Sequence, residues 1–485
     1  MPLPPGFVDE LAASVGESYV LTAAEDLATY DCDGLTGWRA QPACVVLPGS
    51  AEEVQAVLRL CARDGVPFVA RGAGTGLSGG ALPVADGIVV SVARMCRILE
   101  IDLESERVVV QPGVANLDVT RAVAAEGYFY APDPSSQQVC TIGGNVAENS
   151  GGAHCLKHGF TVNHVTGAKV VLPDGELLSL GGKAIDGDDG PDLLGVVIGS
   201  EGTLGIVTRV TVRLLRVPES VQTLLADFPS IAAAGDVVSD VVAAGIVPAA
   251  IEMMDTLAIE AAEEAVHAGY TVGVPAALIV ELDGPAEECG VQFEQVKAIC
   301  EKHGCTRLHI ADSVDERAAI WRGRKAAFAA VGRISPDYFV QDGVVPRTRL
   351  AEVLDRIAAM GEEAGLRVAN VFHAGDGNLH PLVLYNADAG ETERAEHLSG
   401  GIAELCVEMG GSLSGEHGIG TDKACSMPRM FSEDDLAVMQ RVRAAFDPDG
   451  LCNPGKVFPT PRLCGEVPGP YREHPLERAG LAERW

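Results

Sequence analysis

The stretch Arg71 to Gly80 constrains the fold of this chain most strongly. It reads Arg-Gly-Ala-Gly-Thr-Gly-Leu-Ser-Gly-Gly, and the apolar run Val66 to Ala70 leads directly into it. A strand that ends in a glycine loop brings backbone N–H groups close to an anion, because no Cβ atoms stand in the way. The loop lacks the Gly-Lys-Ser/Thr ending of a P-loop and the G-x-G-x-x-G spacing of a dinucleotide fold. By itself it indicates either a pyrophosphate site or an ordinary turn.

Two further glycine clusters follow the first. They are Thr141 to Gly152 and Gly199 to Gly205, and the second precedes the alternating strand Ile206 to Leu214. Between the first two clusters, two prolines fix an irregular turn at Ala131 to Ser136. Turns between strands use glycine in any case. Three clusters at strand ends nevertheless predict that backbone donors and small hydroxyls surround one extended ligand.

Length and charge narrow the class of protein. A chain of 485 residues is longer than one hydrophobic core usually accommodates, so we expect two or more domains. The net charge is 36 − 68 = −32, which disfavours nucleic acid and anionic lipid as partners. No apolar run approaches the ~18 residues of a membrane span, and the first residues do not resemble a signal peptide. The 13 cysteines form no C-x-x-C pair or ferredoxin spacing, so we expect a cytoplasmic chain with mostly reduced, buried thiols.

The pattern changes after Val217-Pro218, where longer helices alternate with strands. Predicted helices are 230–244, 257–268, 292–304 and 350–365, and predicted strands include 275–282, 306–310 and 366–372. This alternation predicts a second α+β domain that covers the ligand bound by the first.

The second domain contains the sequence His373-Ala-Gly-Asp-Gly-Asn-Leu-His380. Asp376-Gly377 predicts a two-residue hairpin turn with the pairs 375/378, 374/379 and 373/380. The two histidines then face each other with Cβ atoms about 5 Å apart, a spacing that suits one divalent metal. The alternative is a pair of ordinary surface histidines on a hairpin.

A third candidate lies at Ser414 to Gly420, where Glu416 can complete a two-histidine, one-carboxylate set and His417 can act as a general base. The alternative is a polar loop with a charged pair. Arg324 can bind a substrate carboxylate through two N–H groups. Alternatively, Arg324 and its basic neighbours form a solvated helix face.

These motifs resemble the vanillyl-alcohol-oxidase (PCMH-type) flavoprotein superfamily. The resemblance covers about Tyr30 to Lys456 and implies FAD. Because the first loop has neither the His nor the Cys that some relatives link to flavin, we expect non-covalent FAD. The residues that the resemblance assigns to the flavin are Arg71, Gly72, Ala73, Gly74, Thr75, Gly76, Leu77 and Ser78 at the pyrophosphate, Pro132, Ser135, Thr141, Gly144, Asn145, Ser150 and Gly151 along the ring and ribityl chain, Gly202 and Ile206 near the adenine, and Asn453 and Lys456 on a C-terminal return.

Within the superfamily, the His373 and Ser414 motifs are similar to those of the 2-hydroxy-acid dehydrogenase branch. The resemblance implies metal ligands His373, His380 and Glu416, with zinc, manganese or iron equally suited. It implies His417 as the base, Arg324 at the substrate carboxylate, and Asn378 at the substrate. Relatives that act on two-carboxylate substrates have a further cation near 339–341, which is uncharged here, so a small substrate is expected.

The expected fold class is α+β, with a PCMH-type FAD-binding domain of two α+β subdomains and an α+β substrate (cap) domain that has an antiparallel sheet. The expected boundaries are an N-terminal segment 1–40, the FAD-binding domain 41–218, the cap domain with the metal site 219–420, a helical segment 421–458 returning to the flavin, and a tail 459–485.

Within this branch, the chain most resembles the FAD-bearing subunits of bacterial glycolate oxidases. The expected reaction is oxidation of glycolate or D-lactate to the 2-oxo acid, with D-2-hydroxyglutarate a weaker alternative. Electrons would pass to a quinone or to partner subunits, one of them an iron–sulfur protein, through which alone the chain would associate with a membrane. Two other classes stay open: a flavin-free metal-dependent hydrolase and a non-catalytic flavin scaffold. A visible spectrum separates the hydrolase from the flavoproteins.

Overall fold

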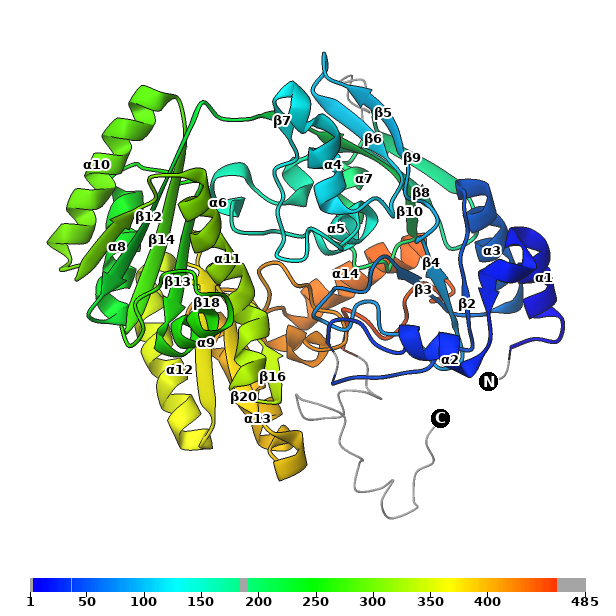
Figure 1. Cartoon of the computed structure of the whole chain (residues 1–485). Coiled ribbons are helices and arrows are strands. Elements are labelled where there is room, and N and C mark those ends of the chain that lie inside the picture. Colours follow the sequence, from blue (N-terminus) through cyan, green and yellow to red (C-terminus); the bar gives the residue numbers. More distant parts are fainter. Residues whose placement is uncertain (1–2, 36, 183–189, 460–485) are drawn as a thin grey trace. The chain divides into compact units, whose positions relative to one another are not determined.

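The structure is a computed structural model that describes residues 3–35, 37–182 and 190–459. Contacts divide the chain into two compact units (Figure 1). The first contains the chain up to Ser150, Phe160–Arg216 and the residues from Glu416 onward, and the second contains Gly151–Gly159 and Val217–Gly415. The short segment 151–159 therefore belongs to the second unit although both of its flanks belong to the first. The predicted tail lies outside the described residues after Pro459.

Two sheets form the first unit. The four-stranded sheet has the order β1 (Val20–Leu21), β2 (Cys44–Val46), β4 (Ile88–Ser91), β3 (Phe68–Arg71), with β2, β4 and β3 parallel. The five-stranded antiparallel sheet has the order β5 (Ile98–Asp102), β6 (Arg107–Val110), β10 (Ile206–Arg213), β8 (Val165–Val171), β9 (Leu177–Gly181). Helices α1 (Phe7–Val15) and α3 (Ala51–Asp64) pack on the first sheet, and α4 (Asn116–Val123) and α5 (Ile142–Glu148) on the second. These are the two predicted α+β subdomains.

The sequence determines the start, the core face and the end of helix α3, which precedes the strand leading to the glycine loop. The side chain of Ser50 accepts a hydrogen bond from the Glu53 N–H at 3.2 Å, as its capping pattern predicts. Apolar residues at helical spacing (Val54, Val57, Leu58 and Cys61) face the core, and Gly65 ends the helix in the left-handed region. The chain then enters β3, which delivers Arg71 to the start of the loop.

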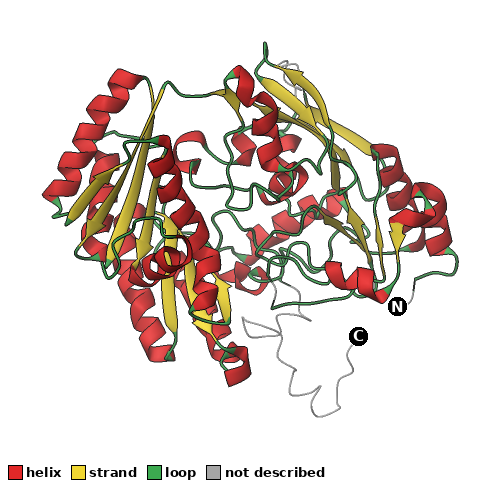
Figure 2. Ribbon diagram, in the orientation of Figure 1, coloured by secondary structure: helices red, strands yellow, loops and turns green. Residues whose placement is uncertain are grey.

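One long, mainly antiparallel sheet forms the second unit. Its order is β15 (Arg307–Ile310), β12 (Ser220–Phe228), β14 (Ala276–Gly284), β13 (Ala250–Asp255), β18 (Arg367–His373), β19 (Asn378–Leu379), β17 (Gly343–Val344), and β20 (Pro381–Tyr385) joins β18 to β16 (Asp337–Val340). Helices α8 (Ile231–Ala243), α10 (Ala286–Lys302), α12 (Leu350–Ala364) and α13 (Thr392–Glu408) pack on one face. Helices α9 (Thr256–Val266) and α11 (Val314–Ala330) pack on the other (Figure 2).

Alternating side chains of the central strands supply the two cores. In β13, Ile251 and Met253 belong to the core under α8 and α10, whereas Ala250 and Met254 belong to the core under α9 and α11. This period of two places Glu252 on the α11 face, in the middle of an apolar strand. None of the helices in the described part of the chain has the length and apolar character that crossing a membrane requires.

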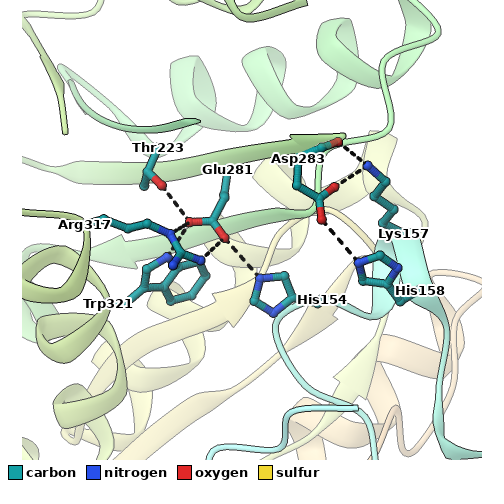
Figure 3. A network of polar contacts seen from close by, with 8 residues as sticks. All are labelled: His154, Lys157, His158, Thr223, Glu281, Asp283, Arg317 and Trp321. Carbon is teal, nitrogen blue, oxygen red and sulfur yellow. Dashed lines mark hydrogen bonds and ion pairs between the residues drawn. The ribbon is translucent and has the colours of Figure 1, made fainter. Parts of the chain in front are cut away.

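A buried carboxylate on β14 fastens helix α11 and the segment 151–159 to the sheet (Figure 3). Glu281 accepts hydrogen bonds from Arg317 at 2.7 and 2.8 Å, from Trp321 at 2.7 Å and from Thr223 at 2.6 Å, and His154 lies 3.3 Å away. Burial by itself raises the pKa of Glu281, but the donors His154 and Arg317 outweigh it and hold the pKa below its usual range.

A second carboxylate on the same strand extends this network. Asp283 pairs with Lys157 and lies 3.5 Å from His158, which attaches the C-terminal end of the short helix α6 (Cys155–His158) to β14. His154, which precedes the helix, attaches its N-terminal end through Glu281. Figure 3 shows the three side chains of the segment pointing toward the two carboxylates. These ion pairs explain why the segment belongs to the second unit.

Replacing Glu281 with alanine should lower the free energy of unfolding by about 3 kcal/mol, because it leaves the indole N–H of Trp321 and the hydroxyl of Thr223, both buried, without their acceptor. Since the folded-state pKa is depressed, this contribution is present above the unfolded pKa of about 4.3 and is lost as the pH falls through the folded value. Urea unfolding at neutral pH measures the difference.

The matched control is Glu294→Ala, which removes an exposed pair with Lys297 on α10 and should change the free energy of unfolding by no more than about 0.5 kcal/mol. Equal losses in the two variants would contradict the anchoring role of Glu281.

Candidate active site

The three predicted glycine loops converge in the first unit. A Cβ atom added at Gly72 would lie 2.3 Å from Oγ1 of Thr141, so the first and second loops touch. Backbone N–H groups of Gly199 and Glu201 donate to the carbonyls of Val146 and Ala147, both at 2.8 Å, so the third loop is bonded to the second. The sequence clusters are therefore neighbours in space, as a single extended ligand requires.

The C-terminal segment joins the first and third loops. The side-chain amide of Asn453 donates to the carbonyls of Gly80 at 2.9 Å and Glu201 at 2.7 Å. Nearby, the ammonium of Lys456 donates to the carbonyl of Leu82 at 2.8 Å. Residue Cys452 pairs with Phe68 at the edge of β3. The segment thus returns to the loops and holds them together through side-chain donors on backbone acceptors.

Two buried carboxyl groups lie beneath these loops. Glu201 accepts hydrogen bonds from the N–H groups of Ile419 at 2.7 Å and Gly420 at 2.5 Å. Burial, and then the nearby charge of Glu201, raises the pKa of Glu148 well above its usual value. Two acids therefore share one desolvated region, and each disfavours the charged form of the other.

The predicted flavin residues divide into two groups. The side chains of Ser78 and Asn453 are buried, and Oγ of Ser78 and Oδ1 of Asn453 have no hydrogen-bond partner among the described residues, which fits a polar cofactor. Others have structural tasks already: Thr141 caps α5 by accepting from Gly144, and the Pro132 carbonyl accepts from Asn116 at 3.0 Å. Gly151 lies in the second unit.

In the second unit, the hairpin register differs from the prediction. His373 pairs with Asn378, and Asn370 pairs with Pro381, so the turn comprises the four residues 374–377 instead of two. A Cβ atom at Gly377 would lie 2.2 Å from the carbonyl oxygen of Val345, which explains glycine there. The predicted pairs 375/378, 374/379 and 373/380 were wrong.

The register error of two residues leaves every side chain on its predicted face, because strand side chains alternate with a period of two. His373 and His380 are therefore diagonal neighbours on the α11 face, and their ring centroids lie 5.1 Å apart. Both are buried, and their nearest ligand nitrogens lie within 4.8 Å of each other. The alternative of two surface histidines is wrong.

A carboxylate that the sequence analysis missed joins His373 to Arg324. Both oxygens of Glu252 lie near Nδ1 of His373, at 2.8 and 3.0 Å, and Nη2 of Arg324 lies 2.6 Å from Oε2. Glu252 is fully buried and Arg324 is 4% exposed. Neither Nε nor Nη2 of Arg324 makes a hydrogen bond among the described residues, so the contact of Nη2 with Glu252 is an ion pair. The guanidinium is thus oriented and still has a donor to offer.

Asp342 has the corresponding position beside His380. Its Oδ1 lies 3.5 Å from Nε2 of His380, and its Oδ2 accepts from the hydroxyl of Ser414 at 2.5 Å and from the N–H of Gly415 at 3.1 Å. The side chain of Asn378 packs against Gly415, where a Cβ atom would lie 2.5 Å from it. Gly415 is the last residue of the second unit, and the predicted Glu416-His417 pair follows it in the sequence.

Both missed carboxylates had a sequence signal. Glu252 is the one charge within the apolar run Ala249 to Met254, and Asp342 stands between the apolar runs 338–340 and 343–345. A charge inside a buried strand has to be paired, so such a residue marks a partner elsewhere in the chain. The sequence does not say which partner.

Comparison with known proteins supplies the family. Residues 42–181 match the family described as "FAD binding domain", and residues 217–457 match "FAD linked oxidases, C-terminal domain". The chain is 51% identical to glycolate oxidase subunit GlcD of Escherichia coli (strain K12) over 94% of its length and 91% of that protein. It is 33% identical to a D-lactate dehydrogenase of Anaerostipes hadrus over 86% of its length and 90% of that protein.

Replacing Gly72 with alanine should expel most of the FAD, because the added Cβ collides with Thr141 and separates the two loops. The ratio of flavin to protein absorbance after gel filtration measures this. Gly290→Ala on α10 is the control, since a Cβ atom there meets nothing within 4 Å. Full flavin content in Gly72→Ala would contradict the assignment of the loops.

Solved structures show the same fold at low sequence identity. The structure of p-cresol methylhydroxylase with bound substrate superimposes with a TM-score of 0.78, covering 94% of this chain and 98% of that one, at 18% identity. The family matches, the similar proteins and the shared fold all indicate FAD binding, as do the converging glycine loops. The chain belongs to the FAD-linked oxidase family and has the fold of p-cresol methylhydroxylase.

Proposed function

We propose that this protein oxidises a small 2-hydroxy acid, glycolate first, to the 2-oxo acid with non-covalently bound FAD. One observation carries the proposal: Arg324, a buried cation with an available donor, is joined through Glu252 to His373, which neighbours His380. A carboxylate receptor beside two metal-binding imidazoles matches the two functional groups of a 2-hydroxy acid. The high identity with a glycolate oxidase subunit favours glycolate.

His373, His380 and Glu416 are proposed to hold a divalent metal. Two imidazoles and a carboxylate suit zinc, manganese or iron. Because Nδ1 of His373 faces the Glu252 carboxylate, its Nε2 has the lone pair for a metal. A metal bound there would supply Lewis-acid chemistry that lowers the pKa of the substrate hydroxyl, and FAD would supply the hydride acceptor.

The side chains of this chain then bind, orient and deprotonate. Arg324 binds the substrate carboxylate and fixes which face of the substrate Cα is presented. Asn378, whose buried Oδ1 has no hydrogen-bond partner among the described residues, orients the substrate hydroxyl. His417 receives the hydroxyl proton as general base. Hydride leaves Cα as the hydroxyl becomes a carbonyl.

The second candidate substrate is D-lactate, since a D-lactate dehydrogenase is among the relatives. A two-carboxylate substrate such as D-2-hydroxyglutarate is disfavoured because 339–341 carries no cation, and the buried Gln341 amide is already bonded to Ser399 at 2.9 Å. Both halves of the chain match FAD-linked oxidase families, which disfavours a flavin-free hydrolase.

Electrons leave the reduced flavin for a quinone or another protein. The relative from Escherichia coli is described as a subunit, which supports partner chains for this protein. One of these is proposed to be an iron–sulfur protein, since the cysteines of this chain lack ferredoxin spacing. We propose that the protein is cytoplasmic and that it associates with a membrane only through such partners.

The function is tested by steady-state assay of the purified yellow protein with glycolate, D-lactate and D-2-hydroxyglutarate and an artificial electron acceptor. We expect the highest kcat/KM with glycolate, then D-lactate. A colourless protein, or one that reduces the acceptor with none of the three acids, would overturn the proposal.

Replacing His417 with alanine should lower kcat by about 10²–10⁴-fold, the usual contribution of a general base, without loss of flavin absorbance. His303→Ala is the control, because that histidine pairs with Asp240 between helices α10 and α8. A His417→Ala enzyme that retains wild-type kcat would exclude this base.

A further inference from the structure

Glu252 is a fully buried carboxylate in the centre of the second unit's sheet. It lies on β13 directly opposite His373 of β18 in the register, with Ile279 of β14 on its other side. A charge without access to water is stable only if it is paired and hydrogen-bonded. Its partners are therefore fixed by necessity, and each is a residue with a proposed task at the reacting centre.

The two partners approach Glu252 from different elements. The imidazole of His373 comes from the neighbouring strand, and its Nδ1 lies 2.8 Å from Oε1. The guanidinium of Arg324 comes from helix α11, and its Nη2 lies 2.6 Å from Oε2. Each carboxylate oxygen thus has a main partner of its own. One side chain sets the orientation of both groups at once.

We propose that Glu252 is a positioning residue that couples the metal site to the substrate-carboxylate site. By accepting from Nδ1 of His373 it fixes the tautomer with a lone pair on Nε2, raises the basicity of that nitrogen and holds the ring plane. By pairing with Nη2 of Arg324 it fixes the guanidinium so that the remaining donors point away from Glu252. The inference rests on the proposed function and extends it.

Glutamine at this position breaks the coupling with little change of shape. Its amide has one acceptor oxygen, so it can serve His373 or Arg324 but not both. The other partner then faces an N–H₂ group, which cannot accept. Glu252→Gln should therefore weaken metal binding, substrate carboxylate binding, or both, while the flavin loops of the first unit are unchanged.

Glu281 provides a matched control on the adjacent strand. It points to the same face as Glu252, because it pairs with Ala250, two residues before Glu252. It also binds an arginine of helix α11, Arg317, two turns before Arg324. It contacts neither His373 nor Arg324 in any bond described above. Glu281→Gln thus disturbs a buried carboxylate–arginine pair of the same helix without touching the proposed coupling.

The experiment titrates Mn²⁺ into the metal-stripped, FAD-loaded full-length protein and its two variants, followed by steady-state kinetics with glycolate and by thermal unfolding. For Glu252→Gln we expect the Kd for Mn²⁺ to rise about 10–100-fold. We expect KM for glycolate to rise about tenfold or more. For Glu281→Gln we expect wild-type Mn²⁺ affinity and KM with a lowered Tm.

Wild-type Mn²⁺ affinity and KM in Glu252→Gln would overturn the inference. Equal losses of Mn²⁺ affinity in both variants would also overturn it, because the effect would then come from general loosening of the sheet. If the wild-type protein binds no Mn²⁺, both the metal assignment and the coupling are wrong. If none of the acids reduces the flavin, the proposed function is wrong. The Mn²⁺ affinities of the wild type and Glu252→Gln still test whether Glu252 positions the metal site.

Discussion

The pairing of one buried charge, Glu252, joins two strands and a helix of the second unit. Glu252 has no access to water, so strand β13 is stable only with His373 on β18 and Arg324 on α11 beside it. Satisfying that charge brings together β13 and β18, whose residues Glu252 and His373 are 121 positions apart in the sequence, and helix α11 between them in the chain. The same carboxylate that the fold has to neutralise thereby fixes the orientation of two side chains to which we assign tasks in the proposed reaction.

The first unit solves a different problem, which is to hold three flexible glycine loops in one arrangement. Backbone bonds join the second loop to the third, and Asn453 joins the first to the third through two carbonyls. Glycine gives close approach to a phosphate but costs conformational entropy, so such loops need external support. The C-terminal segment supplies it, and this explains why residues far along the chain belong to the flavin-binding unit.

Local patterns predicted much of this. The Ser50 cap, the apolar strand before Arg71 and the face shared by His373 and His380 follow from short-range rules and are confirmed. The turn at 374–377 was missed because Asp376-Gly377 is a strong two-residue signal, whereas pairing of β18 with β20 sets the actual register. Glu252, Asp342 and the attachment of 151–159 to Glu281 and Asp283 depend on which distant partner neutralises which charge, and a single sequence does not contain that information.

Anaerobic mixing of the oxidised protein with glycolate, followed by flavin absorbance, tests the central claim most directly. We expect glycolate to bleach the flavin of the metal-loaded protein fully in a single turnover, without any partner protein, because all the side chains proposed to bind and orient the substrate belong to this chain. A flavin that stays oxidised with saturating glycolate and D-lactate, in protein loaded with divalent metal, would contradict it.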